Sequence, residues 1–190
     1  MKFSLALAGL LIATTAATAM AKDGPYIEAQ GGTTIVHNSD VTVTGLGTGN
    51  ISYDAGGCFV LSAGGNIGNS RFEGEFGYKN ASIRNASSAD ITVLSYMANA
   101  FYDFKNESAT VPFIGAGLGL LNGEIKANGA SENANTFGYQ FMVGLGYKAT
   151  EHVTIDLTYK FQGAASDFSK DNVNISFQSS NILAGLRYNF

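Results

Sequence analysis

The chain has 190 residues, with 11 basic and 15 acidic side chains and a formal net charge of −4 at pH 7, which argues against a surface built to bind nucleic acid. The single cysteine, Cys58, excludes an intramolecular disulfide. Glycine is abundant (24 residues), proline is scarce (2), and aromatic residues (12%) are nearly as frequent as charged ones (14%), a composition typical of membrane β-barrels.

The first segment of the chain, residues 1–21, has the features of a secretory signal peptide. Lys2 precedes a short apolar run at residues 3–13, and small residues lead to Ala21. The apolar run is shorter than the roughly 20 residues that a membrane-spanning helix needs. We therefore predict cleavage after Ala21 and export of residues 22–190 as one domain.

The rest of the chain alternates between bulky apolar residues and small or polar ones, with the two-residue period of a β-strand. In residues 136–147, the bulky side chains from Phe137 to Tyr147 share one face, and glycines share the other with Gln140 and Met142. In chain order, the eight predicted strands cover residues 26–34, 55–64, 71–78, 91–104, 113–121, 136–147, 153–162 and 175–190.

The connections between these segments vary in length in a regular way. Long connections are predicted at residues 37–52, 79–90, 122–136 and 163–174, and shorter ones at 66–70, 105–112 and 148–152. Long and short connections then lie at opposite ends of the strands. The pattern predicts an all-β fold, an eight-stranded antiparallel up-and-down transmembrane β-barrel with short periplasmic turns and four long extracellular loops.

A soluble sandwich or a lipocalin-like barrel would also alternate, but with its bulky face in the core. Two features favour the membrane barrel. The polar faces are rich in glycine and short side chains, which suits a narrow lumen. Aromatic residues also stand at the ends of segments, where membrane barrels place interfacial girdles; they are Tyr26, Tyr78, Tyr102, Phe104, Tyr147, Phe161, Tyr188 and Phe190.

Charged residues on the predicted polar faces are the first candidates for function. A nearly balanced set of acids and bases in a narrow barrel is expected to form ion pairs and hydrogen bonds that fill the lumen. The alternative is a gated, narrow ion path that opens when a few such pairs break. The predicted lumen network consists of Glu28, Arg71, Glu73, Glu75, Asp156, Lys160 and Arg187.

Catalytic and metal-binding residues are sparse. His37 precedes Ser39 and Asp40, but adjacent positions on a loop do not preorganise a nucleophile and its base. His152 is expected to be an exposed turn residue beside Glu151. The histidines and the cysteine are widely separated, so we predict no enzyme activity, no metal site and no cofactor.

The predicted loops are rich in Asn, Ser, Gly and Ala. One interpretation is a hydrated surface without a single partner. The other is weak contact with a host surface protein or glycan through apolar residues of the first loop, namely Val41, Val43, Leu46 and Ile51.

Two stretches resemble a known family. Residues 95–123, "SYMANAFYDFKNESATVPFIGAGLGLLNG", are similar to a strand, turn and strand of the opacity-type small outer-membrane proteins, the neisserial surface protein A-like barrels. The ending "NILAGLRYNF" resembles the C-terminal signal read by the barrel-insertion machinery, with Gly185, Tyr188 and Phe190 at the matching positions and Leu183 at a position that is usually polar.

This resemblance implies a monomeric protein of the bacterial outer membrane, in contact with outer-membrane lipid and lipopolysaccharide, with both chain ends in the periplasm. It also implies surface roles such as adhesion or host contact. We therefore predict a non-catalytic structural or host-interacting surface protein, and the alternative is a narrow pore or a conduit for small hydrophobic ligands.

Overall fold

The computed structural model describes residues 24–37, 39–43, 47–51, 53–82, 89–127, 130–165, 168–170, 173–175 and 177–190. The predicted signal segment, residues 1–21, and Leu46 of the predicted contact loop lie outside these ranges. Within them, the elements are β-strands, and no helix has the length and apolarity needed to cross a membrane.

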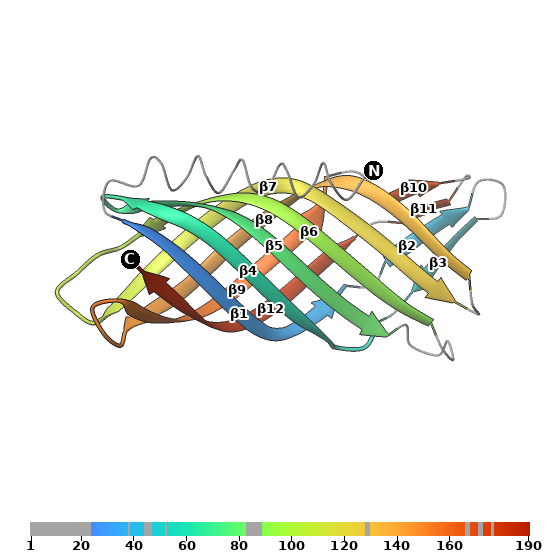
Figure 1. Cartoon of the computed structure of the whole chain (residues 1–190). Helices are drawn as coiled ribbons and strands as arrows, with labels where there is room; N and C mark the ends of the chain where they lie inside the picture. Colours follow the sequence, from blue (N-terminus) through green and yellow to red (C-terminus); the bar gives the residue numbers. More distant parts are fainter. Residues whose placement is uncertain are drawn as a thin grey trace.

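Eight of the strands form a closed antiparallel barrel, steeply tilted to its axis (Figure 1). The barrel closes where β1 pairs with β12, from Tyr26 opposite Asn189 to Val36 opposite Ser179. Closure leaves no open sheet edge along the wall, as hydrocarbon requires. The predicted fold is confirmed by the barrel strands β1 (Pro25–Val36), β4 (Gly56–Ile67), β5 (Ser70–Ser82), β6 (Ala89–Asp103), β7 (Thr110–Ala127), β8 (Ala130–Lys148), β9 (Val153–Ala164) and β12 (Gln178–Asn189).

The two ends of the barrel differ. At one end, the connections are the short segments 68–69, 104–109 and 149–152. At the other end, a second sheet is inserted, with strands in the order β10 (Phe168–Lys170), β11 (Val173–Ile175), β2 (Ser39–Val43) and β3 (Gly47–Ile51). Short turns face the periplasm in bacterial barrels, so we call these the periplasmic end and the outer end.

The connection predicted at residues 122–136 is not a long loop, so the prediction of four long loops was wrong here. β7 continues to Ala127, β8 begins at Ala130, and the two strands pair along this whole stretch. Asn122 lies opposite Asn135, and its Nδ2 donates to Asn135 Oδ1 at 2.6 Å. Ladder hydrogen bonds satisfy the backbone of polar residues as well as apolar ones, so a strand can form here without an apolar alternation.

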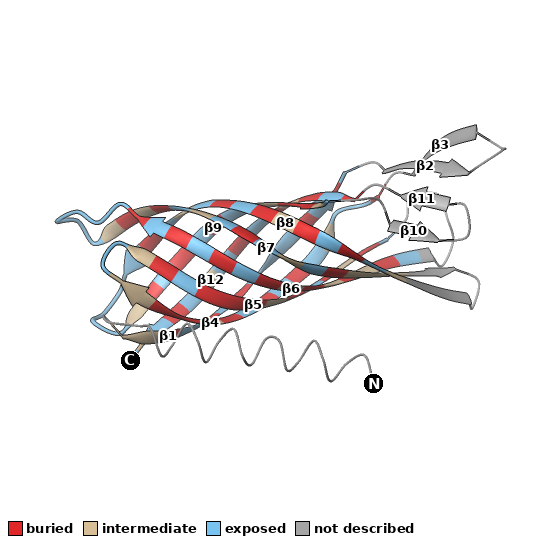
Figure 2. Cartoon of the chain, turned by 90° about the horizontal axis from the view of Figure 1, so that it is seen from above, coloured by how far each residue is buried: buried red, intermediate tan, exposed pale blue. Residues whose placement is uncertain are grey.

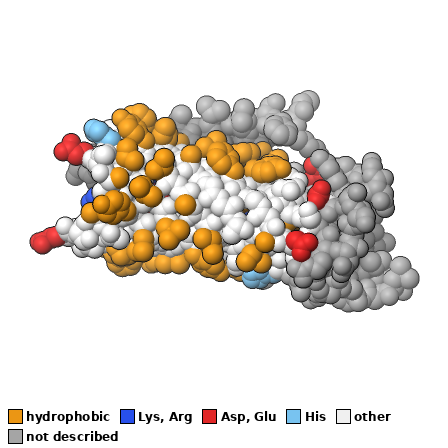
Figure 3. Space-filling view, turned by 90° about the horizontal axis from the view of Figure 1, so that it is seen from below, with side chains coloured by type: hydrophobic (Ala, Val, Ile, Leu, Met, Phe, Trp, Pro, Cys, Tyr) orange, Lys and Arg blue, Asp and Glu red, His pale blue; other side chains and the backbone are white. Residues whose placement is uncertain are grey.

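Exposure alternates along the barrel strands (Figure 2), and many of the bulky apolar side chains are on the exposed face. In β9, Leu157 is 54% exposed, whereas Asp156 and Thr158 on either side of it are buried. Apolar side chains gather along the wall of the barrel (Figure 3). A soluble barrel would show the opposite order, so the outward band is a wall that faces lipid.

Tyr26 is a correction to the predicted aromatic girdle. Its side chain is fully buried inside the barrel, and its hydroxyl donates to Glu73 Oε2 at 2.7 Å. The reason is its position in β1, where it shares the inward face with Glu28 and Gln30. Tyr188, by contrast, lies on the outward face.

Inward glycines of β7 provide space for large side chains of β6. A β-carbon on Gly115 would lie 2.3 Å from Cδ1 of the Phe101 ring, and one on Gly117 would lie 1.9 Å from Asn99 Oδ1. Both distances are far below van der Waals contact. The glycine-rich stretch of residues 115–119 is therefore the thin part of the wall, over which the lumen side chains fit.

We predict that Leu157→Arg destabilises the barrel in lipid vesicles by about 2–4 kcal/mol, because it places a charge on the lipid face near the middle of β9. Urea unfolding followed by heat-modifiable gel migration measures this cost. Glu151→Arg in the exposed turn at residues 149–152 is the matched control and is expected to change stability by less than about 0.5 kcal/mol. Equal effects of the two variants would contradict a lipid-facing Leu157.

Candidate functional site

The interior near the periplasmic end is organised around Arg71 of β5. Its Nε donates to both carboxylate oxygens of Asp103, at 2.9 and 3.0 Å. The guanidinium lies 4.5 Å from the ring centroid of Phe101, 5.0 Å from that of Phe113 and 5.8 Å from that of Tyr26. Cation–π attraction strengthens when the cation is desolvated, so the ion pair and the three rings together close this part of the lumen.

Glu75 is the centre of the middle layer. Its carboxylate accepts hydrogen bonds from Lys160 Nζ at 2.7 Å, from Asn99 Nδ2 at 2.7 Å and from Gln140 Nε2 at 3.0 Å. The three donors come from β9, β6 and β8, while Glu75 comes from β5, and all four side chains are buried. One carboxylate therefore joins four strands across the lumen.

The hydrogen bonds continue from Glu75 in both directions along the barrel. Toward the outer end, Gln162 Nε2 donates to Gln140 Oε1 at 2.9 Å, and Lys79 Nζ donates to Gln162 Oε1 at 2.6 Å. Toward the periplasmic end, Asn99 Nδ2 donates to Glu73 Oε1 at 3.0 Å. Buried polar chains of this kind rigidify an interior when their members are paired.

A second ion pair lies in the periplasmic half of the lumen. Arg187 Nη2 is 3.2 Å from Asp156 Oδ1, and both side chains are buried. In β1, which pairs with β12, Gln30 Nε2 donates to Glu28 Oε1 at 2.6 Å. The same nitrogen donates to Thr158 Oγ1 of β9 at 3.2 Å. The acids and bases of the lumen are thus held by direct hydrogen bonds.

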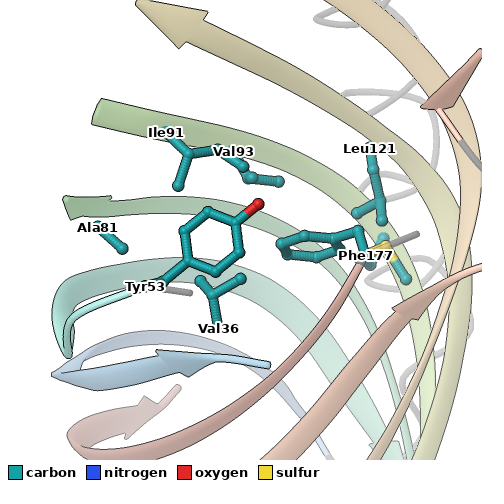
Figure 4. Packing of buried hydrophobic residues seen from close by; sticks show 8 residues of the cluster. Val36, Tyr53, Ala81, Ile91, Val93, Leu121 and Phe177 are labelled. Atoms are coloured by element: carbon teal, nitrogen blue, oxygen red, sulfur yellow. The ribbon is translucent and has the colours of Figure 1, made fainter. Parts of the chain in front are cut away.

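An apolar cluster lies in the outer part of the lumen. Tyr53 precedes β4 and Phe177 precedes β12, and both rings project into the space between the barrel strands (Figure 4). Both side chains are buried, so the two connections that carry them fold inward over the barrel. We call this cluster the apolar cap; its members are Val36, Tyr53, Ala81, Ile91, Val93, Met97, Leu121 and Phe177.

The filled interior leaves little free volume. The cavity between Glu28, Arg71, Glu75 and their neighbours has a volume of about 10 Å³, roughly the space of one water molecule. This cavity among the described side chains can therefore hold about one water molecule.

All seven charged residues predicted for the lumen lie inside the barrel and are buried. Sequence reasoning missed Asp103, the partner of Arg71, and the buried Lys79. Lys79 is the first residue of the predicted connection at residues 79–90, and Asp103 lies within the predicted strand at residues 91–104. Both follow the inward parity of their strands, as the buried neighbours Asn99 and Phe101 show for Asp103. Extending the strand predicted at residues 71–78 by one residue would have found Lys79, and reading the parity of residue 103 would have found Asp103.

The predicted insertion signal lies at the periplasmic end of β12. Tyr188 and Phe190 face outward, with ring centroids 5.1 Å apart, whereas Gly185 lies on the inward parity. His152 of the adjacent turn is exposed, as predicted, and its Nδ1 lies 3.1 Å from the carbonyl oxygen of Asn189. The turn therefore holds the last strand near its end.

The other sequence candidates lie at the outer end. His37 Nε2 lies 2.9 Å from Ser180 Oγ, and the side chains of Ser39 and Asp40 are outside the described side chains. Within the described ranges, no group of three or more His, Cys, Asp or Glu side chains could hold a metal ion.

The predicted contact loop takes part in the second sheet. Val41 and Val43 belong to β2 and Ile51 belongs to β3, and these backbones pair within that sheet. β2 also pairs with β11, so that Val41 lies opposite Ile175. The first and last outer connections are therefore joined by backbone hydrogen bonds, although they are far apart in sequence.

Comparison with known proteins agrees with this geometry. The sequence profile of the family described as "Outer membrane protein beta-barrel domain" matches residues 3–190. The outer membrane protein PagN of Salmonella typhimurium is 26% identical over 195 residues, which cover 81% of this chain and 80% of PagN. The candidate adhesin RC1281 of Rickettsia conorii is 26% identical over 119 residues, which cover 51% of this chain and 48% of that protein.

Among solved structures, the crystal structure of neisserial surface protein A (NspA) is similar to this chain. The TM-score is 0.63 and the sequence identity is 26%, with 88% of this chain and 98% of NspA covered. The outer membrane protein OprG of Pseudomonas aeruginosa shares the fold, with a TM-score of 0.59, 16% identity, and coverage of 90% of this chain and 97% of OprG.

We predict that Lys160→Met destabilises the barrel by about 3–5 kcal/mol, because it leaves the Glu75 carboxylate buried without its cation. Urea unfolding in vesicles measures the change. The double variant Lys160→Met with Glu75→Gln is expected to lose less than the sum of the two single changes. Strictly additive losses would show that the two side chains are not energetically coupled.

Proposed function

Since this chain belongs to the outer membrane protein β-barrel family, we propose that it is a non-catalytic surface protein that acts as an adhesin-like contact with host surfaces. Its place in the bacterial outer membrane follows from the family and from the outward apolar wall. The proposal concerns what the barrel does there. The observation that carries it is the contrast between a filled lumen and extended strands at the outer end.

The filled lumen argues against a transport role. Arg71, Glu75 and their partners occupy the interior, and the apolar cap covers the outer mouth. An apolar constriction resists the entry of water and ions. A barrel of this kind serves as a rigid support rather than as a passage.

The outer end extends well beyond the closed barrel. The last pairing of β8 with β9 joins Gly138 to Ala164, so Ala130–Phe137 of β8 continues past the end of β9. At the usual rise of about 3.3 Å per residue, these eight residues span about 26 Å along the strand. Together with the second sheet, the paired strands β7 and β8 extend the outer end with strand backbone, which suits contact with another macromolecule.

The relatives add limited support. RC1281 is named as a candidate adhesin, and the similarity covers about half of each protein. PagN and NspA are an outer membrane protein and a surface protein, respectively. We extend a surface-contact role to this chain on these grounds and on the shape of its outer end.

We predict that removal of the β7–β8 extension lowers bacterial binding to cultured epithelial cells by about tenfold, because interface energy is concentrated in few contacts. In this variant an Asn-Gly turn joins Leu121 to Thr136, which lie opposite each other and suit a two-residue hairpin. Bacteria that produce equal amounts of surface protein would be counted on the cells.

The matched control for this binding assay changes the periplasmic connection at residues 104–109, with Glu107 and Ser108 both replaced by glycine. It is expected to bind cells like the unaltered protein. Unchanged binding after removal of the hairpin would exclude residues 122–135 from the contact surface.

The alternative of a narrow pore makes a different prediction. We expect planar bilayers that contain the protein to show closed records, both for the unaltered chain and for Arg71→Gln and Arg187→Gln, because the apolar cap remains over the outer mouth. Stable conductance steps in the unaltered protein, changed in size by either variant, would instead favour the pore.

A further inference from the structure

A polar cluster lies on the outward face of the barrel at its outer end. His37, just after β1, has its Nε2 2.9 Å from Ser180 Oγ of β12, and Tyr159 of β9 has its hydroxyl 3.0 Å from the same Ser180 oxygen. The three residues come from three adjacent strands. This cluster plays no part in the lumen network or in the second sheet.

The neighbours of the cluster are apolar and aromatic. Ser180 lies directly between Ile35 of β1 and Phe161 of β9 in the register of the sheet. The Phe161 ring is 6.1 Å from the His37 ring in an edge-on arrangement. The small Ser180 side chain is therefore flanked by larger apolar and aromatic ones.

The hydrogen bonds within the cluster leave one donor over. The His37 imidazole carries at least one N–H, and Ser180 and Tyr159 carry one O–H each, which makes at least three donors. Two contacts join these groups. If the imidazole accepts from Ser180, its other nitrogen keeps an N–H; if it donates, the O–H of either Ser180 or Tyr159 is left over. Either arrangement leaves at least one N–H or O–H without a partner among these three residues.

The position of this donor indicates what it meets. On β9, the outward band runs from Val153 to Phe161, so Tyr159 and Phe161 lie in its outer girdle, the depth at which headgroups meet acyl chains. A donor left unpaired in hydrocarbon is costly, whereas headgroups offer carbonyl, hydroxyl and phosphate oxygens as acceptors. The covering partner on this face is a lipid of the outer leaflet.

We propose that His37, Ser180 and Tyr159 form a binding site for the headgroup of a lipopolysaccharide molecule in the outer leaflet. The donor left over bonds an oxygen of the glycolipid, and the Phe161 ring packs against the apolar face of a sugar ring. Lipopolysaccharide is the expected occupant because it is the saccharide-bearing lipid of the leaflet that this end of the barrel meets.

Binding fits the cluster better than ester cleavage does. A serine bonded to a histidine is also the arrangement of a nucleophile and its base. However, the contacts of the described residues place no carboxylate on the His37 ring and no set of donors where an oxyanion would form. The cluster can bind a headgroup without cleaving its esters.

The test measures lipids retained by the purified full-length protein. Protein is reconstituted into nanodiscs that contain deep-rough lipopolysaccharide and phosphatidylglycerol, released into detergent, and analysed by native mass spectrometry. Ser180→Ala, Tyr159→Phe and the triple variant with His37→Gln are compared with Tyr188→Phe, a tyrosine of the opposite girdle. Heat-modifiable migration confirms that each variant is folded.

We expect the triple variant to retain lipopolysaccharide about tenfold less than the unaltered protein, since one or two net hydrogen bonds correspond to a factor of this size. Phosphatidylglycerol retention and the Tyr188→Phe control should stay unchanged. Tyr159→Phe keeps the ring and removes only the hydroxyl, so a fall of a few fold in that variant would support the site even if the triple variant folded poorly.

Three results would overturn the proposal. The first is equal lipopolysaccharide retention by Tyr159→Phe, Ser180→Ala and the unaltered protein. The second is an equal loss of both lipids, which would indicate a general change of the wall. The third is release of free fatty acid by the unaltered protein but not by Ser180→Ala, which would make the cluster an esterase. Binding to epithelial cells is measured separately and does not depend on this site.

Discussion

The structure depends on the absence of water from the interior of a lipid bilayer. Hydrocarbon offers no partner to a backbone N–H or C=O, so a sheet that crosses it must close on itself. Here closure is made by the eleven pairs that join β1 to β12. The same solvent reverses the usual arrangement of a barrel, so that Phe141 and Leu157 face outward and Glu75 and Lys160 face inward. The polar interior is therefore a consequence of the wall.

Charged side chains are present in the interior, and each is paired with an opposite charge or a hydrogen-bond partner. Each ion pair spans neighbouring or facing strands, and Glu75 receives three donors at once. Desolvation of such charges offsets much of their attraction, so their main effect is to fix the relative positions of the strands. Glycines at 115 and 117 complete this arrangement, because the thin wall of β7 admits the side chains of Phe101 and Asn99.

The alternation of residues was sufficient to predict the number of barrel strands, the closed fold and the inward direction of the seven charged side chains assigned to the lumen. The prediction failed where residue type and strand parity indicated different positions for one side chain. Tyr26 was assigned to the girdle because it is an aromatic residue at a strand end, but its parity places it inside with Glu28. The stretch of residues 122–136 is rich in small and polar residues without an amphipathic alternation, so the pattern gave no signal for the paired strands found there. The contact of His37 with Ser180 joins residues 143 positions apart, which no local pattern can reveal.

The apolar cap has a consequence for how the outer surface can change over evolution. Tyr53 and Phe177 stand where the two sheet-bearing connections enter the barrel, and both are buried against the same cluster. These two positions are held by packing inside the barrel, so the rest of each connection does not have to anchor it. Substitutions in the outer connections, such as those selected by antibodies, can then change the exposed surface while the packing of Tyr53 and Phe177 stays the same.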